Sequence, residues 1–270
     1  MKFSDKLETA VRKKNSCLIL GLDPIMEKMP EKFSKDPNGI LDFLKGVIEE
    51  TEDMICGVKI QMAYFEVFGS KGVAAVEDLL KFCRDKDLIT ISDGKRGDIG
   101  STSTAYAEAF LGKDVPMESD ALTVNPFLGT DGVKPFVEFC EKNGRGIFVL
   151  VRTSNPSAVE FQGGENEISV KVANMVEDLG LTTLSDKNFF SSVGAVVGAT
   201  LDPKFLEFWR EEMPHTWMLC PGVGAQGGNV EDVLKLRKNG LGVLIPVSRS
   251  VLYAEDPKAE MQTLFEAQKV

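Results

Sequence analysis

The amino-acid sequence predicts an α/β protein, a (β/α)8 TIM barrel in a single domain that spans residues 1–270. Eight short runs are apolar almost throughout instead of alternating, which is typical of parallel strands buried on both faces. Amphipathic helical stretches separate these runs from end to end. The eight units follow one another without a Pro- or Ser-rich linker, which favours one barrel over a two-domain doubly wound protein.

Each expected strand is a run of three to six mostly apolar residues, such as LILGL, ITIS or LIPV, bounded by polar or Gly-rich segments. We expect strands at 17–22, 55–60, 88–92, 121–124, 147–151, 193–197, 218–220 and 243–247. Each expected helix repeats its apolar residues at helical spacing. We expect helices at 5–13, 40–50, 73–84, 101–111, 133–141, 170–179, 205–212, 230–238 and 257–268.

The charge balance limits the possible partners. Lys and Arg total 31 and Asp and Glu total 41, so the formal net charge is −10. Such a chain repels nucleic acids and anionic membranes, and any phosphate that it binds must be held in a local pocket. The N-terminus lacks the apolar region of a secretory signal, and no apolar run approaches the length of a membrane span. We therefore expect no nucleic-acid or membrane partner.

Cysteine and histidine usage restricts the chemistry. The five cysteines are scattered, odd in number and never in a C-x-x-C pair, which indicates buried thiols in a reducing compartment, and we expect a cytoplasmic protein. His215 is the only histidine, and its place after Met213-Pro214 suggests a surface loop. The single histidine argues against a His-based zinc site and against a Ser-His-Asp triad elsewhere in the chain, and we expect neither metal nor cofactor.

Polar and charged residues gather where the expected strands end. Asp23, Lys59 and Asp93 with Lys95 follow three strands in the first half of the chain. Later strands end in 152–155, in the Gly-rich run 221–228 and in Ser248-Arg249. Active sites of (β/α)8 barrels lie at the C-terminal ends of the strands, so the sequence predicts a site built from six strands.

The stretch DGKRGD supplies the most concentrated charge. Asp93 and Lys95 are two positions apart, so we expect both side chains to point into the barrel mouth, while Asp98 lies beyond Gly97 at the start of the next helix. With Lys59 and Asp23 from neighbouring strands, the pattern predicts an alternating lysine–carboxylate array that holds a protonated lysine rigidly against developing negative charge. The alternative interpretation is a purely structural ion-pair network.

The run PGVGAQGG contains a formal G-x-G-x-x-G pattern. A dinucleotide-binding interpretation would place it near the start of a βαβ unit, but it follows the seventh expected strand. Loops after the seventh and eighth strands are the recurrent phosphate site of barrels, so we expect a phosphate to contact this loop, the helix N-terminus near Asn229, Gln226 and the fork of Arg249. The alternative is an ordinary turn with a capping arginine.

These motifs, taken in order, resemble the orotidine 5′-phosphate decarboxylase family, in its longer subfamily. The resemblance covers GLDP, GVKIQ, SDGKRGDIG, RTSNP, VGAT, PGVGAQGG and PVSRS, and therefore nearly the whole chain. It implies cofactor-independent decarboxylation of orotidine 5′-phosphate to UMP in pyrimidine biosynthesis. It also implies a homodimer whose active sites are shared between the subunits.

The resemblance assigns four catalytic residues. Lys95 would protonate carbon 6 of the pyrimidine as the carboxylate leaves, and Asp93 would lie against that carboxylate. Lys59 and Asp98 would complete the charge array, with Asp98 reaching in from the partner subunit.

The resemblance also assigns the substrate-binding residues. Asp23 and Lys59 would bind ribose hydroxyls, and either Thr153 or Ser154 would read the pyrimidine edge. The remaining assignments are a closing loop with Pro221 and Gln226, a phosphate site with Gln226 and Arg249, and two residues from the partner subunit, Ile99 and Thr102.

Two alternatives remain at this point. Relatives that act on sugar-phosphate keto acids or aldol substrates resemble this chain at D-x-K-x-x-D, but they carry an acidic magnesium ligand where this chain has Lys59. A catalytically inactive nucleotide-binding scaffold is the second alternative, and the intact Lys95 with both aspartates argues against it. An assay of orotidine 5′-phosphate turnover in EDTA separates these three functions.

Overall fold

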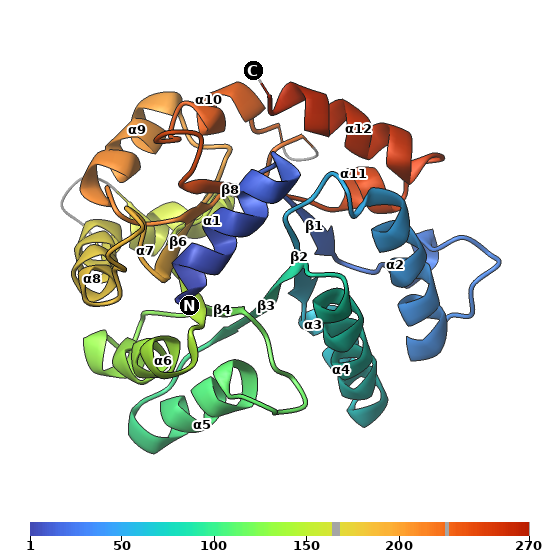
Figure 1. Cartoon of the computed structure of the whole chain (residues 1–270), viewed down its shortest axis with the longest axis horizontal. Helices are drawn as coiled ribbons and strands as arrows, with labels where there is room; N and C mark the ends of the chain where they lie inside the picture. The colour runs from blue at the N-terminus through green and yellow to red at the C-terminus, as the bar shows by residue number, and fades with distance from the viewer. Residues whose placement is uncertain (164–167, 225–226, 270) are drawn as a thin grey trace.

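Eight parallel strands close into a barrel in which each strand pairs with its neighbours in sequence order and the last pairs with the first. The structure, a computed structural model, describes residues 1–163, 168–224 and 227–269. Figure 1 shows the helices arranged around the strands. The strands are β1 (Leu18–Leu22), β2 (Gly57–Gln61), β3 (Ile89–Arg96), β4 (Ala121–Val124), β5 (Gly146–Arg152), β6 (Val193–Val197), β7 (Met218–Leu219) and β8 (Val243–Val247). The predicted fold class is confirmed.

Most helices of the described residues connect consecutive strands on the outside of the barrel, whereas α1 precedes β1 and α12 follows β8. The longer ones are α1 (Phe3–Lys14), α2 (Pro37–Thr51), α4 (Ser70–Asp85), α5 (Gly100–Leu111), α6 (Thr130–Asn143), α8 (Ile168–Thr182), α9 (Pro203–Glu212) and α12 (Pro257–Ala267). The short ones are η1 (Met26–Lys28), α3 (Ala63–Glu66), η2 (Pro156–Ala158), α7 (Val159–Gln162), α10 (Val230–Leu234) and α11 (Arg249–Leu252).

Three helices begin at the same dipeptide, Asp-Pro. Asp36, Asp202 and Asp256 precede α2, α9 and α12, and each carboxylate accepts a hydrogen bond from a backbone N–H of the first turn. Proline at the first helical position has no N–H to leave unpaired, and such a capping carboxylate is worth about 1 kcal/mol. These caps place the starts of α2 and α9 before the first apolar residue of each helix, which is why apolar spacing alone predicted them two or three residues late.

The interior of the barrel is packed and closed at one end by α1. Phe3, Leu7 and Val11 of α1 belong to the same buried cluster as barrel residues such as Ile91 and Phe148. The ring centroids of Phe3 and Phe148 lie 6.2 Å apart with their planes nearly perpendicular, and Figure 1 shows α1 lying across the strands. The opposite end, where the strands finish, stays available for a site.

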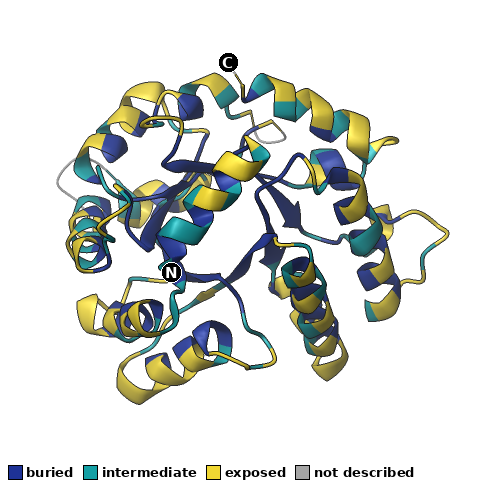
Figure 2. Ribbon diagram, in the orientation of Figure 1, coloured by how far each residue is buried: buried dark blue, intermediate teal, exposed yellow. Residues whose placement is uncertain are grey.

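A second buried cluster fills the space between the strands and the surrounding helices, so most strand residues are buried on both faces (Figure 2). This double burial is the physical reason for the nearly continuous apolar runs in the sequence. The predicted elements differ from the structure mainly at their ends. Strand β3 continues to Arg96, four residues beyond the prediction, and the helix predicted at 230–238 ends at Leu234. Short helices α3, α7 and α11 were not predicted, because four residues are too few to show a helical period.

Candidate active site

A cavity of about 250 Å³ opens where the strands end, and residues from all eight strands or the loops after them line it. The predicted site residues that line it are Asp23, Lys59, Asp93, Lys95, Thr153, Ser154, Pro221 and Arg249. Residues far apart in the sequence therefore meet at one point, as the barrel prediction requires. Gln226 lies outside the described residues.

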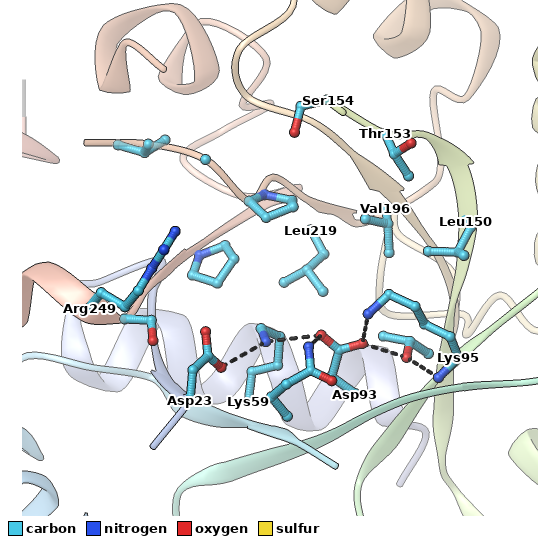
Figure 3. A pocket seen from close by; sticks show the side chains of 17 residues that line it. Asp23, Lys59, Asp93, Lys95, Leu150, Thr153, Ser154, Val196, Leu219 and Arg249 are labelled. Atoms are coloured by element: carbon cyan, nitrogen blue, oxygen red, sulfur yellow. Dashed lines mark hydrogen bonds and ion pairs between the residues drawn. The ribbon is translucent and has the colours of Figure 1, made fainter. Parts of the chain in front are cut away.

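Four charged side chains form a row along one wall of this cavity (Figure 3). The Lys59 Nζ atom lies 3.6 Å from Oδ1 of Asp23 and 2.9 Å from Oδ2 of Asp93. The Lys95 Nζ atom lies 2.6 Å from the other oxygen of Asp93, Oδ1. The predicted lysine–carboxylate array is thus present within a single chain, with Asp93 bridging the two ammonium groups.

The charges of this array shift the pKa values of its buried members. Burial alone would raise the pKa of the Asp93 carboxyl, but the ammonium groups of Lys59 and Lys95 hold that pKa well below its usual range. Burial alone would lower the pKa of Lys59, but Asp93 and Asp23 raise it above its ordinary value. Asp93 is therefore ionised and Lys59 is protonated at neutral pH.

Lys95 occupies an unusual backbone conformation. Its φ is +46°, in the left-handed region that a non-glycine residue adopts at a cost on the order of 1–2 kcal/mol. The pairing of β3 with β4 also shifts in register between Ser92 and Arg96, around this residue. Lys95 and Asp93 therefore meet because this segment of β3 is irregular. The prediction that both side chains point into the barrel mouth rested on regular strand alternation, which does not hold here.

Two neutral side chains complete the surroundings of Asp93, and sequence analysis missed both. Gln61 Nε2 donates a 3.0 Å hydrogen bond to Oδ2, and Thr123 Oγ1 donates a 2.9 Å hydrogen bond to Oδ1. The signals were present in the sequence: Gln61 follows Lys59 by two positions in GVKIQ, and Thr123 is the polar residue of the apolar run ALTV. With the two lysines, these groups give both carboxylate oxygens two close partners each.

The same cavity has an apolar part that motif analysis did not identify. Leu150, Val196 and Leu219 line it from β5, β6 and β7, and Figure 3 shows them above the charged row. Pro246 of β8 also lines the cavity. Apolar residues of this kind could not be singled out in the sequence, because buried strands are apolar everywhere. The site therefore combines a fixed charge array with a low-polarity surface.

Arg249 follows β8 and begins α11, on the Asp23 side of the cavity (Figure 3). Pro221, Gly222 and Val223 of the Gly-rich loop line the same cavity. Gly222 and Gly224 have φ values of +107° and +73°, which only glycine adopts readily, so the loop needs these residues. The described residues that line this cavity do not include the start of α10, and the contact of a phosphate with the helix N-terminus near Asn229 stays a prediction.

Asp98, Ile99 and Thr102 do not line the cavity of their own chain. The Oδ1 atom of Asp98 accepts a 2.7 Å hydrogen bond from the Ile99 N–H, directly before α5. Ile99 is 55% exposed, and Thr102 is exposed as well. The structure thus separates these three residues from the other predicted site residues.

The described residues contain no group of three or more His, Cys, Asp or Glu side chains arranged to hold a metal ion. His215 lies away from the cavity, and its Nδ1 atom is 2.5 Å from Oε1 of Glu177. In the part of the chain that the structure describes, no helix is long and apolar enough to cross a membrane. The chemistry of the cavity is carried by lysine, aspartate, arginine, hydroxyl and amide groups.

Known proteins are similar to this chain in both sequence and fold. Residues 16–264 match the profile of the orotidine 5′-phosphate decarboxylase / HUMPS family. The orotidine 5′-phosphate decarboxylase of Caldicellulosiruptor bescii is 38% identical over 278 residues, covering 94% of this chain and 90% of that protein. The protein of the same name from Rhodopirellula baltica is 38% identical over 94% of this chain and 89% of its own length.

A solved structure agrees with this relationship. The structure of Leishmania donovani OMP decarboxylase superposes with a TM-score of 0.84 and 30% sequence identity, covering 100% of this chain and 98% of that one. The match extends over the barrel and every strand that contributes to the cavity. The chain belongs to the orotidine 5′-phosphate decarboxylase / HUMPS family.

Proposed function

We propose that this chain decarboxylates orotidine 5′-phosphate to UMP in pyrimidine biosynthesis, without a cofactor. The observation that carries the proposal is the row Asp23–Lys59–Asp93–Lys95 at the mouth of the barrel. The relatives described above are named for this activity. The row supplies what the reaction needs, a rigid cation beside the carbon that loses its carboxylate.

Lys95 is the proposed proton donor. Loss of carbon dioxide from the pyrimidine leaves an electron pair on carbon 6 in the plane of the ring, where the ring orbitals cannot delocalise it. A fixed ammonium group stabilises that developing charge and then transfers a proton to the same carbon. The 2.6 Å contact with Asp93 supports this role, because it directs the flexible side chain of Lys95 before the substrate arrives.

Asp93 is the proposed neighbour of the substrate carboxylate. Its depressed pKa keeps it ionised, so it would repel the negatively charged carboxylate of the substrate. This repulsion would end when the carboxylate leaves as carbon dioxide. Carbon dioxide is uncharged, and the apolar surface of Leu150, Val196 and Leu219 is compatible with it. The described geometry therefore favours the products over the bound carboxylate.

The ends of the cavity suggest how the rest of the nucleotide binds. Asp23 and Lys59 are the proposed ligands of the ribose hydroxyls, and Arg249, with Gln226 of the closing loop, is the proposed phosphate ligand. Pro221 belongs to the same loop and lines the cavity. Thr153 and Ser154 both line the opposite side, and the pyrimidine edge is assigned to one of the two. Binding energy from the remote phosphate can then hold the ring against Lys95.

The proposed assembly is a homodimer with shared active sites. Asp98, Ile99 and Thr102 stand outside their own cavity at the rim near β3, and the partner subunit would supply them to the site. Nearby apolar side chains support a contact there: Ile99 is 55% exposed and Phe127, after β4, is 75% exposed. Five free cysteines, all buried, support the proposed cytoplasmic location.

Two other functions fit the site less well. A magnesium-dependent sugar-phosphate enzyme needs an acidic ligand at the end of β2, where Lys59 forms its ion pairs with two aspartates. An inactive nucleotide-binding scaffold has no need of Lys95 in a strained backbone conformation. The site therefore favours the decarboxylase.

The test is turnover of orotidine 5′-phosphate by the purified chain in excess EDTA, followed by the change in ultraviolet absorbance. The Lys95→Ala variant is the matched control and should lose at least about a thousandfold in kcat. Absence of turnover by the wild-type chain would overturn the proposed function. Turnover of a sugar phosphate that depends on added magnesium would support the first alternative.

A further inference from the structure

Strand β4 faces the irregular segment of β3 with a single residue. Ser92 pairs with Leu122 and Arg96 pairs with Val124, so Asp93, Gly94 and Lys95 on β3 are matched by Thr123 alone on β4. Two extra residues on one strand form a bulge, and such a bulge disrupts the regular backbone hydrogen bonds. The side chain of Thr123 therefore lies where the backbone ladder is interrupted.

The Thr123 hydroxyl accepts a hydrogen bond from one backbone N–H of the bulge and also holds the side chain of Asp93. It donates a 2.9 Å hydrogen bond to Oδ1 of Asp93 and accepts a 2.9 Å hydrogen bond from the N–H of Lys95. Thr123 is 1% exposed, so water does not compete readily for these bonds. The same Oδ1 atom of Asp93 also receives the ammonium group of Lys95. One hydroxyl thus fixes the main chain of Lys95 and the carboxylate that directs its side chain.

This arrangement matters because the left-handed φ of Lys95, +46°, needs support from its surroundings. Without the hydroxyl, the N–H of Lys95 would lose its acceptor, and among the described residues Oδ1 of Asp93 would keep only the ammonium group of Lys95 as a partner. We propose that Thr123 is a positioning residue: it acts on the reaction through Lys95 and Asp93, by holding the bulge that aims the Lys95 ammonium group. This inference rests on the proposed decarboxylase function.

The chain offers a matched control at the start of β3, the strand that carries the bulge. Thr90 is fully buried, its hydroxyl donates a 3.2 Å hydrogen bond to Oδ2 of Asp120, and it accepts a 3.0 Å hydrogen bond from the Asp120 N–H. The contacts are of the same kind as those of Thr123, a carboxylate and a backbone amide. Thr90 is not among the residues that line the cavity. A substitution there removes an equivalent buried hydroxyl away from the site.

The experiment compares Thr123→Val, which keeps the shape but removes the hydroxyl, with Thr123→Ser, which keeps the hydroxyl, and with Thr90→Val. For each chain we would measure kcat and KM for orotidine 5′-phosphate, the Kd of UMP and the melting temperature. Thr123→Val should lose about tenfold to a hundredfold in kcat with a small change in the Kd of UMP, because misplacement by about 1 Å costs this much. Thr123→Ser should recover most of kcat, and Thr90→Val should keep kcat while melting earlier.

Three results would overturn the inference while leaving the proposed function intact. The first is an unchanged kcat in Thr123→Val. The second is a loss of kcat in Thr123→Ser as large as that in Thr123→Val, and the third is a loss of the same size in Thr90→Val. If Thr123→Val does not fold, Thr123→Ala takes its place in the same comparison. A wild-type chain without turnover would instead contradict the proposed function itself, so the two failures are distinguishable. A crystal structure of the Thr123→Val variant should also show the contact between Lys95 Nζ and Asp93 Oδ1 lengthened or lost.

Discussion

The ammonium group of Lys95 lies 2.6 Å from Oδ1 of Asp93, and the same carboxylate holds Lys59 on its other oxygen at 2.9 Å. One buried carboxylate therefore bridges two lysines that come from neighbouring strands. Removing this carboxylate would leave two cations close together. Removing either lysine would raise the pKa of Asp93, because both lysines lower it. The array is stable only as a unit, which makes its pH dependence informative.

We predict that the stability difference between the wild-type chain and Asp93→Asn depends on pH. The folded-state pKa of Asp93 is depressed, so its ionised form stabilises the fold above the ordinary carboxyl pKa of about 4, and this contribution is lost as pH falls toward the depressed value. The difference in unfolding free energy should be nearly constant from about pH 5 to 8 and should contract by on the order of 1 kcal/mol at pH 3.5, just below the ordinary carboxyl pKa of about 4. Denaturant titrations at pH 7.5, 5 and 3.5 measure it. An equal difference at pH 7.5 and 3.5 would contradict the prediction.

We predict that Arg249→Ala weakens the use of the phosphorylated substrate selectively. A charge-assisted, two-pronged contact with a phosphate is worth about 2–3 kcal/mol, so kcat/KM for orotidine 5′-phosphate should fall about thirtyfold or more. Turnover of orotidine, which lacks the phosphate, should hardly change.

The control for Arg249→Ala is Lys235→Ala, which removes one cation directly after α10 and does not touch the cavity. It should leave kcat/KM for both substrates close to the wild-type values. Equal losses with orotidine and its phosphate in Arg249→Ala would show that Arg249 supports the structure instead of binding phosphate.

We predict that exhaustive chelation leaves turnover unchanged. In the proposed mechanism the cation beside the reacting carbon is the ammonium group of Lys95, and Lys59, which also lines the cavity, stands where a magnesium-dependent relative would place an acidic ligand. Dialysis against EDTA, followed by metal analysis and a turnover assay with and without added magnesium, measures this. Activity that returns only with magnesium would favour a sugar-phosphate enzyme.

Much of the fold could be predicted because parallel strands buried on both faces leave nearly continuous apolar runs. The charged residues at strand ends were equally visible, since Asp23, Lys59 and Asp93 interrupt such runs. Thr123 was missed although it is the polar residue of the run ALTV, because its importance comes from a bulge in β3 that no local pattern encodes. The apolar part of the cavity was missed because Leu150 looks like any other buried strand residue.

The final prediction concerns the shared site and uses mixtures of inactive chains. Asp98 lies outside the cavity of its own chain, whereas Lys95 lines it, so the proposed dimer brings Asp98 of one subunit to Lys95 of the other. In a two-fold symmetric dimer, each subunit donates what it also receives. Chains with Lys95→Ala and chains with Asp98→Ala should each be inactive alone.

When the two variants are unfolded together and refolded, a mixed dimer should contain one site with both defects and one site with neither. If the chains pair at random, half of the dimers are mixed and half of their sites are intact, so roughly a quarter of wild-type activity should return. Native mass spectrometry verifies that mixed dimers have formed, and refolded wild-type chains give the reference activity. Mixed dimers without activity would mean that Asp98 serves the site of its own chain, after a movement that brings it to the cavity, because an intact site formed across the interface would be active.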